Sequence, residues 1–187
     1  MRTIPGMTVI VPCDDTEAKA AVRAAYATDG PVYMRFGRLA VPVVNDPEGF
    51  EFEIGKGILM REGADVTIVA CGLMVQAALE AAESLAAKGV SAEVIKLESV
   101  KPVRMREITA SVRKTGRLLV AEDAICIGCA GKEILSQLRL CGIRVPTRLC
   151  NLGDRFVTHG KVQELQRLYG LDAESLAKQA QEVLHET

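Results

Sequence analysis

The stretch DVTIVACGLMVQAALEAAESLAAKGVSAEVIKLES, residues 65–99, carries the clearest structural pattern in this chain. It begins with a short β-branched apolar run and continues as an amphipathic segment that ends at Gly89. A second apolar run, SAEVIKLES (91–99), follows directly. Apolar runs on both sides of a helical segment are typical of parallel strands buried on both faces. The stretch therefore predicts a strand–helix–strand unit.

The same alternation extends in both directions along the chain. After residue 99 the pattern predicts, in order, a helix closed by Gly116, the strand RLLVAED, the helix GKEILSQLRLCG, the strand RVPTRLC and two final helices, KVQELQRLYG and DAESLAKQAQEVLHE. Before residue 65, the apolar run TVIVP leads into a helix that Asp14 or Asp15 can cap, and a further strand follows Pro31. This order of elements predicts an α/β fold, with a largely parallel sheet covered by helices.

Prolines cluster between the early strands and the regular part of the chain. Pro31 lies just before, and Pro42 and Pro47 lie within, the stretch LAVPVVNDPEGFEF (39–52). Proline interrupts both helices and sheet ladders, so this stretch is the best candidate for a linker.

The composition is that of a soluble globular protein of 187 residues, 49% of them hydrophobic and 25% charged. With 23 basic and 24 acidic residues, the net charge of −1 argues against a nucleic-acid binder that depends on phosphate neutralisation. The sequence contains neither an apolar stretch of bilayer length nor a signal-peptide core. We expect a cytoplasmic protein without a membrane partner, whose six cysteines are reduced and mostly buried.

Cys126 and Cys129 form a CxxC pair directly after a predicted strand. Such a pair can be a redox-active dithiol or half of a metal site. A four-thiolate zinc site needs a second close pair, however, and Cys141 and Cys150 are too far apart in the sequence to form one. We interpret the segment ICIGCAGKE as a turn of small residues that lets a loop pass close to the sheet edge.

Two arginines stand out near the end of the second predicted strand. Arg35 and Arg38 lie where α/β proteins collect ligands, and a guanidinium group suits phosphate or carboxylate. A surface ion pair is an equally good interpretation of each arginine. His159 lies beside Asp154 in a polar loop and could act as an acid or base, although loop histidines are more often solvated or structural. The sequence contains no P-loop, no GxSxG and no HExxH motif.

Four stretches taken together resemble one family. Residues 1–38, MRTIPGMTVIVPCDDTEAKAAVRAAYATDGPVYMRFGR, resemble the end of the pyrimidine-binding domain of transketolase-like, thiamine-diphosphate-dependent enzymes. Three later segments resemble the transketolase C-terminal domain. They are the segment that starts with EIGKGILMREGADVTIVACG and runs to Val103, the segment TGRLLVAEDAICIGCAGKEI, and the segment LGDRFVTHGKVQELQRLYGLDAESL. The nearest likeness is to stand-alone C-terminal sections of transketolases. The ending DRFVTHG is similar to 1-deoxy-D-xylulose-5-phosphate synthase, and the E1 β subunits of 2-oxo acid dehydrogenases share this architecture.

The resemblance implies a remnant of a pyrimidine-binding domain in residues 1–44 and a transketolase C-terminal domain in residues 45–187. Met1 would then be an internal methionine of a longer protein. The parent enzyme would transfer a two-carbon ketol unit between sugar phosphates, using thiamine diphosphate and a divalent metal such as Mg²⁺ held elsewhere. We expect no cofactor and no activity in this chain alone. Its partners would be an N-terminal transketolase section, fused or separate, a second copy in a homodimer and a sugar-phosphate substrate.

The resemblance also assigns roles to individual residues. Arg38 matches the position where the family keeps an arginine that binds the phosphate of the substrate, and Arg35 is a weaker candidate for the same role. His159 matches the HG of the synthase, which implies an interface or structural role for His159 and, with it, Asp154. The resemblance transfers no catalytic, cofactor-binding or metal-binding residue. The rival interpretation is a non-catalytic assembly or binding domain.

Overall fold

The computed structural model describes residues 1–186. Its strands are β1 (Thr8–Ile10), β2 (Val32–Met34), β3 (Gly57–Arg61), β4 (Val66–Ala70), β5 (Ala92–Leu97), β6 (Leu118–Ala121) and β7 (Thr147–Cys150). Its helices are α1 (Asp15–Ala27), α2 (Met74–Ala86), α3 (Arg106–Thr115), α4 (Ala130–Leu140), α5 (Val162–Leu168) and α6 (Ala173–Leu184).

The main sheet has five strands in the order β3-β5-β4-β6-β7. Strand β4 pairs in parallel with β5 on one side and β6 on the other, and β7 continues the parallel set. Every residue of β4, β5 and β6 is buried, as expected for strands covered on both faces. The strand–helix–strand unit predicted from residues 65–99 is confirmed as β4, α2 and β5.

One edge of the sheet departs from the predicted pattern. Strand β3 pairs antiparallel with β5, and its register shifts between Leu59 and Arg61. This strand was not predicted from the sequence. Four of its five residues are only partly buried or exposed, so it lacks the continuous apolar run that marks the inner strands.

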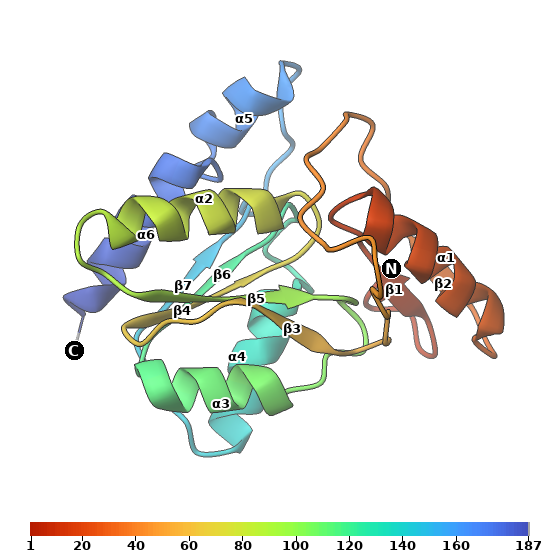
Figure 1. Ribbon diagram of the computed structural model, residues 1–187, viewed down its shortest axis with the longest axis horizontal. Coiled ribbons are helices and arrows are strands. Elements are labelled where there is room, and N and C mark those ends of the chain that lie inside the picture. Colours follow the sequence, from red (N-terminus) through yellow and green to blue (C-terminus); the bar gives the residue numbers. More distant parts are fainter. Residues whose placement is uncertain (187) are drawn as a thin grey trace.

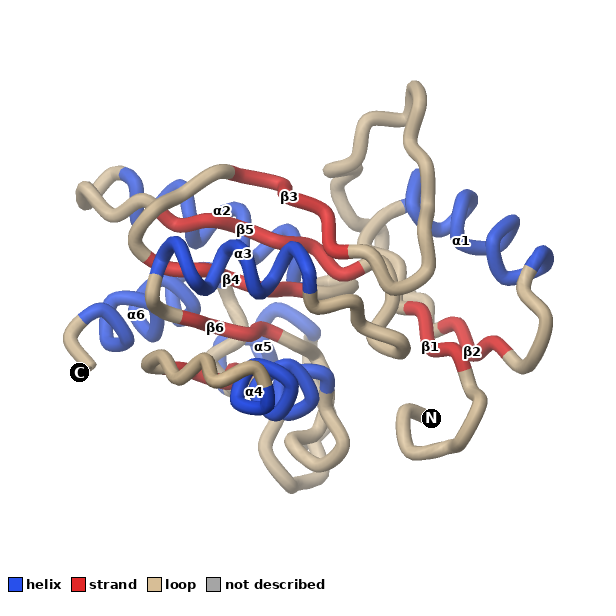
Figure 2. Tube along the Cα trace, turned by 90° about the horizontal axis from the view of Figure 1, so that it is seen from below, coloured by secondary structure: helices blue, strands red, loops and turns tan. Residues whose placement is uncertain are grey.

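Helices cover both faces of the main sheet (Figures 1 and 2). One apolar cluster joins α2 and α6 to one face, and a second joins α3 and α4 to the other. Helix α2 contributes three buried alanines, Ala78, Ala81 and Ala82, and these small side chains let it lie close to both the sheet and α6. The α/β layer arrangement predicted from the sequence is confirmed.

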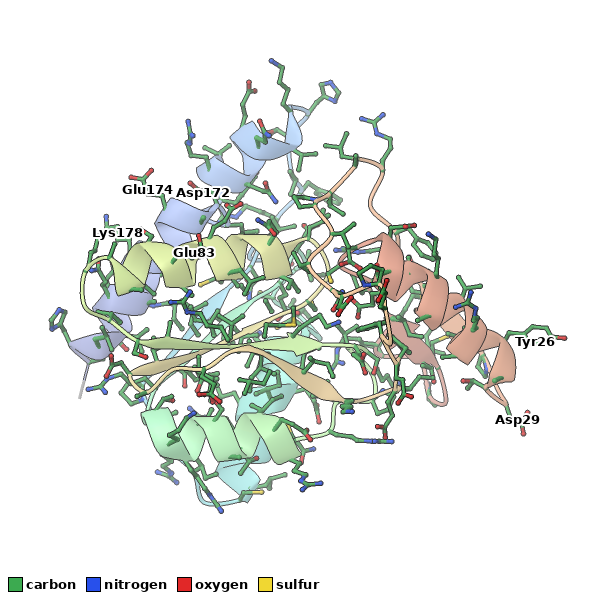
Figure 3. All side chains as sticks on the ribbon, viewed as in Figure 1. Tyr26, Asp29, Glu83, Asp172, Glu174 and Lys178 are labelled. Atoms are coloured by element: carbon green, nitrogen blue, oxygen red, sulfur yellow. The ribbon has the colours of Figure 1, made fainter. Side chains whose placement is uncertain are left out.

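The first part of the chain forms a small unit beside the main sheet (Figure 1). Strands β1 and β2 pair in parallel as a separate two-stranded sheet, with α1 between them in the sequence. Asp14, rather than Asp15, caps α1 by accepting a hydrogen bond from Glu17 N. Tyr26 near the end of α1 is 94% exposed and projects away from the molecule (Figure 3). Two strands and one helix bury little apolar area, so this unit depends on its contacts with the main sheet.

Backbone contacts hold the small unit against the main sheet. Val9 N donates to Lys101 O at 2.8 Å, and Val100 N donates to Val9 O at 2.9 Å. The turn between β4 and α2 also reaches β1, because Gly72 has a φ of +54° and a Cβ there would lie 2.6 Å from Val11 Cγ1. Glycine is therefore required for this close approach. Within residues 1–186, no helix has the length and apolar character needed to span a bilayer.

Candidate functional site

Arg35 lies directly after β2, at the side of the small unit that faces the main sheet. Its backbone N–H donates to Ile10 O at 3.0 Å and so extends the pairing of β2 with β1. Its guanidinium donates to the backbone oxygen of Asp123 at 2.7 Å and to the Asp123 carboxylate at 3.2 Å. The guanidinium of Arg35 is therefore engaged by a residue that follows β6 of the main sheet.

Arg38, three residues further along, lies in the loop between β2 and β3 and is exposed. None of the ion pairs found among residues 1–186 involves Arg38. A free guanidinium presents paired N–H donors that match the oxygens of a phosphate. Of the two arginines singled out in the sequence, Arg38 is the one available to an external anion.

Arg38 borders a groove of about 500 Å³. One wall is the loop from Arg38 to Pro42, and the others come from α2, α5 and the start of α6. Arg167 on α5 is an exposed cation in the same lining, whereas Asp172 and Glu80 are acidic. The loop therefore places the Arg38 guanidinium at the rim of the groove, where it can bind a charged group of a ligand without burying that charge.

A second polar cluster lies deep between the small unit and the main sheet. Lys96 in β5 and Glu17 in α1 both have side chains that are 0% exposed, and Lys96 Nζ lies 3.5 Å from Glu17 Oε2. Lys96 Nζ also donates to Asn45 Oδ1 at 2.8 Å and lies 4.5 Å from the centre of the Phe50 ring. We call Asp14, Glu17, Asn45 and Lys96 the junction network.

Asp14 connects this network to the linker. One carboxylate oxygen, Oδ1, caps α1, and the other, Oδ2, accepts hydrogen bonds from Val44 N, Asn45 N and Asn45 Nδ2 at 2.8–2.9 Å. Glu17 Oε2 in turn accepts from Cys13 N at 2.9 Å. The network therefore ties α1, the linker and β5 together through donors that belong to the chain itself.

Burial and hydrogen bonding move the acid pKa values of this network in opposite directions. Desolvation raises the pKa of Glu17, and the attraction of Lys96 offsets only part of that effect. Burial alone would also raise the pKa of Asp14, but the hydrogen bonds from Glu17, Asn45 and Val44 together bring it below its usual value. The carboxylate form of Asp14 is thus favoured, whereas burial disfavours the charged form of Glu17 and Lys96 opposes that effect.

Glu98 is a further buried acid two residues after Lys96. One of its oxygens accepts a hydrogen bond from Glu53 N at 2.9 Å, whereas Oε1 has no hydrogen-bond partner among the residues described. Desolvation raises the pKa of Glu98 to about 7, against smaller opposing effects from Glu53 N and Lys96. Glu98 therefore titrates near neutral pH.

A cavity of about 440 Å³ separates the N-terminal residues from the loop after β6. Glu122 in its wall accepts hydrogen bonds from Ala130 N and Gly131 N at 2.9 and 2.8 Å, so it caps the N-terminus of α4. Arg35 and Asp123 in the same wall bind each other. The charged groups of this cavity are thus committed to internal contacts.

The CxxC segment behaves as a structural turn. Cys129 is buried, and desolvation raises the pKa of its thiol, which is opposite to the acidic thiol that redox chemistry requires. Within residues 1–186, Cys13, Asp14 and Glu17 are the one group of ligand atoms close enough to share a metal ion, and the CxxC pair is not part of it. Arg2 Nε donates to Gly128 O at 2.9 Å, so this turn packs against the start of the chain.

Asp154 and His159 lie together in the loop between β7 and α5, and both are exposed. Phe156 between them is 100% exposed. The structure does not bring these two residues to the groove wall formed by Arg38, whose lining on this side begins at Val162. An interface role for them remains a prediction.

The junction network and the partner of Arg35 were both missed at the level of sequence. One signal for Lys96 was present, because a lysine in the middle of the buried run AEVIKL must have a buried partner. Nothing in the sequence pointed to Asn45 or Asp123, which meet their partners only through the fold.

Comparison with protein families finds two matching domain models. Residues 55–176 match the transketolase C-terminal domain, and residues 1–43 match the transketolase pyrimidine-binding domain. These matches confirm the resemblance stated from the sequence.

Curated relatives include transketolase subunits and a 1-deoxy-D-xylulose-5-phosphate synthase. The chain is 42% identical to the 6-deoxy-6-sulfo-D-fructose transketolase subunit SqwH of Clostridium sp. (strain MSTE9), over 98% of this chain and 56% of the relative. It is 36% identical to an apulose-4-phosphate transketolase subunit of Phocaeicola vulgatus, over 97% of this chain and 58% of the relative. It is 38% identical to 1-deoxy-D-xylulose-5-phosphate synthase of Heliobacterium modesticaldum, over 98% of this chain and 28% of the relative.

Among solved structures, the chain is similar to a split-gene transketolase described as an inactive beta4 tetramer. The TM-score is 0.91 and the identity 38%, over 98% of this chain and 59% of that chain. The chain therefore spans little more than half the length of the transketolase subunits it matches.

Proposed function

This chain belongs to the transketolase family, and on that premise we propose that it is the C-terminal part of a thiamine-diphosphate-dependent enzyme. The complete enzyme would transfer a two-carbon ketol unit between sugar phosphates in the cytoplasm. The chemistry of that transfer belongs to the cofactor, which stabilises the carbanion, while the protein supplies binding and orientation. This chain would contribute binding of the substrate phosphate.

The observation that carries this proposal is the availability of Arg38. Its guanidinium is exposed at the rim of the 500 Å³ groove, whereas the guanidinium of Arg35 is engaged by Asp123. In this proposal, Arg38 binds two phosphate oxygens through paired N–H donors and leaves the reacting end of the sugar free. Arg35 then supports this segment instead of contacting the substrate.

The residues of this chain do not fit thiamine diphosphate or its metal ion. Both oxygens of Asp14 and Oε2 of Glu17 already accept hydrogen bonds from backbone amides, and the Lys96 ammonium occupies the position of a cation beside Glu17. In the 440 Å³ cavity, Glu122 caps α4 and Arg35 pairs with Asp123, so these charged groups are already engaged and are not open to a diphosphate. We therefore assign no step of the reaction to these groups and propose that the isolated chain is inactive.

The proposal includes an N-terminal transketolase section, either fused to this chain or carried by a separate polypeptide. Relatives named as transketolase subunits support the separate arrangement. A homodimer of the complete enzyme is part of the proposal. Sedimentation of the purified chain, with and without the N-terminal section, would measure both associations.

The test is a comparison of two arginine variants in the assembled enzyme. We expect Arg38→Ala to raise KM for a phosphorylated acceptor roughly tenfold to a hundredfold, as loss of a charge-assisted hydrogen bond does, with little effect on an unphosphorylated sugar. Arg23→Ala is the matched control, because Arg23 is an exposed arginine on α1 of the same unit. Equal KM values of the two variants for the phosphorylated acceptor would contradict the phosphate-binding role of Arg38.

A second candidate activity is 1-deoxy-D-xylulose-5-phosphate synthesis. The ending DRFVTHG and the 38% identity to the synthase of Heliobacterium modesticaldum favour it. Assay of the assembled enzyme with pyruvate as donor separates the two activities. Turnover of pyruvate with release of CO₂ would identify the synthase, and ketol transfer without CO₂ would identify the transketolase.

A further inference from the structure

We propose that Asp123 is a positioning residue that acts through Arg35 on Arg38 and so sets the preference of the enzyme for phosphorylated substrates. This inference rests on the proposed phosphate role of Arg38. It assigns to Arg35 a different role from the one expected from the sequence, where Arg35 was a second phosphate ligand. The segment from Arg35 to Arg38 can transmit such an effect because it is short and its first residue is held against the main sheet.

The first feature of this segment is the contact between Arg35 and Asp123. The guanidinium donates to both the backbone oxygen and the carboxylate of Asp123, at 2.7 and 3.2 Å. Two bonds from one planar group define its orientation better than one bond does. Arg35 also pairs through its backbone with Ile10, so the contact fixes the end of β2 relative to the main sheet.

Asp123 itself is held firmly by its neighbours. The preceding residue, Glu122, caps α4 through Ala130 N and Gly131 N and donates its own N–H to Cys150 O at 3.0 Å. Leu152 N donates to Ala124 O at 2.9 Å on the other side. Asp123, which binds Arg35, therefore lies between two residues, Glu122 and Ala124, whose backbone groups are hydrogen-bonded.

A second feature of the segment is Gly37, which is exposed but lies near Leu73 at the start of α2. A Cβ on Gly37 would lie 3.3 Å from Leu73 Cδ2, which shows how closely the backbone approaches this side chain. Arg38 follows immediately and opens onto the groove. Arg38 is three residues from Arg35, so in this proposal the Arg35–Asp123 contact sets where the Arg38 guanidinium enters the groove.

The experiment uses the assembled enzyme with Asp123→Asn, Arg35→Met and Arg35→Lys. The Arg35–Asp123 pair is partly exposed, so we expect Asp123→Asn to raise KM for a phosphorylated acceptor about two- to fivefold. We expect kcat, and KM for an unphosphorylated sugar, to stay unchanged. Arg35→Met should have the larger effect because it also loses the bond to the Asp123 carbonyl, and Arg35→Lys should restore part of the loss. Asp15→Asn, which breaks an exposed ion pair with Lys19 on α1, is the matched control.

Combination with Arg38→Ala separates positioning from a merely structural role. If Asp123 acts through Arg38, Asp123→Asn has no further effect on KM once Arg38 is absent. An equal change for both kinds of sugar, or an undiminished change in the Arg38→Ala background, would overturn the inference while leaving the phosphate role of Arg38 intact. If Arg38→Ala itself fails to discriminate between the sugars, the proposed function and this inference fall together.

Discussion

The junction network and the Arg38 loop are two charged regions of the same molecule with opposite surroundings. In the junction network, Lys96 and Glu17 are 0% exposed and each finds its partner within the chain. In the loop, Arg38 is exposed and has no ion-pair partner among residues 1–186. Charges of the first kind hold parts of the structure together, whereas those of the second kind are available to a ligand.

This difference can be tested, because the two kinds of charge respond to substitution in different measurements. A buried charge that loses its partner lowers the free energy of unfolding by several kcal/mol. An exposed charge changes stability little and affects only the binding of whatever it contacts. We therefore expect the largest change in stability at the buried pair and the smallest at the exposed loops.

Lys96→Met should lower the free energy of unfolding by about 3–5 kcal/mol, because it leaves Glu17 buried without its cation. Chemical denaturation measures this change. Lys19→Met is the control, since Lys19 pairs with Asp15 at the surface of α1 with both side chains 66% exposed. That variant should change stability by no more than about 0.5 kcal/mol. Equal losses in the two variants would contradict the assignment of Lys96 as the structural charge.

Gly72→Ala should lower the free energy of unfolding by about 1–3 kcal/mol through strain and overpacking against Val11. The same denaturation experiment tests the apolar contact between the small unit and the main sheet. Gly49→Ala is a close control, because Gly49 also has a positive φ but a Cβ there meets nothing within 4 Å. The difference in free energy of unfolding between the two variants measures the contact with Val11. If the two variants lose equal stability, the small unit does not depend on the close contact of Gly72 with Val11.

Glu98→Gln should change how stability depends on pH. The pKa of Glu98 is raised from 4.5 to about 7 in the folded state, so the folded chain binds the proton more tightly than the unfolded chain does. Its contribution to stability is therefore present at acid pH and is lost as pH rises toward 7. We expect the glutamine variant to lack this slope and to gain about 1–2 kcal/mol above pH 7, because no uncompensated buried charge forms.

Denaturation at a series of pH values checks this prediction, with Glu51→Gln as an exposed control two residues before Glu53, whose N–H binds Glu98. Glu17, whose pKa is also raised, contributes a dependence of stability on pH of the same sign in the unsubstituted chain and in the Glu98→Gln variant. Asp14, whose pKa is lowered, contributes the opposite slope at more acid pH, and this slope should survive the substitution. An unchanged profile between pH 4.5 and 7 would show that Glu98 is not the titrating group.

Asp154→Ala and His159→Ala should change the free energy of unfolding of this chain by less than about 0.5 kcal/mol, since both side chains are exposed. An interface role would show only as a higher dissociation constant of the assembled enzyme, measured by sedimentation. Loss of stability in the single chain would instead indicate contacts that make these residues structural.

Much of the fold could be predicted because it depends on local pattern. The strands β4, β5 and β6 are continuous apolar runs, and the helices between them end at glycines such as Gly116. Strand β3 could not be predicted because an edge strand needs only one buried face and GILMR shows little alternation. Its direction, antiparallel to β5, depends on the path of the linker and not on its own residues.

The candidate site was predictable only in part, for a related reason. The sequence shows that Arg35 and Arg38 are near a strand end, but it does not show which of them is free. That distinction depends on Asp123, which is distant in the sequence and reaches Arg35 through the packing of β6 beside the small unit. The pairing of Glu17 with Lys96 is likewise a product of tertiary structure.

The junction network also limits how this protein can recombine with its homologues. Asp14 and Glu17 lie before residue 44, whereas Asn45 and Lys96 lie after it. A hybrid gene that crosses over between residues 44 and 45 inherits half of the network from each parent. Unless both parents carry matching halves, the hybrid protein buries a mismatched charge. A crossover at this point therefore requires parents in which these four residues match.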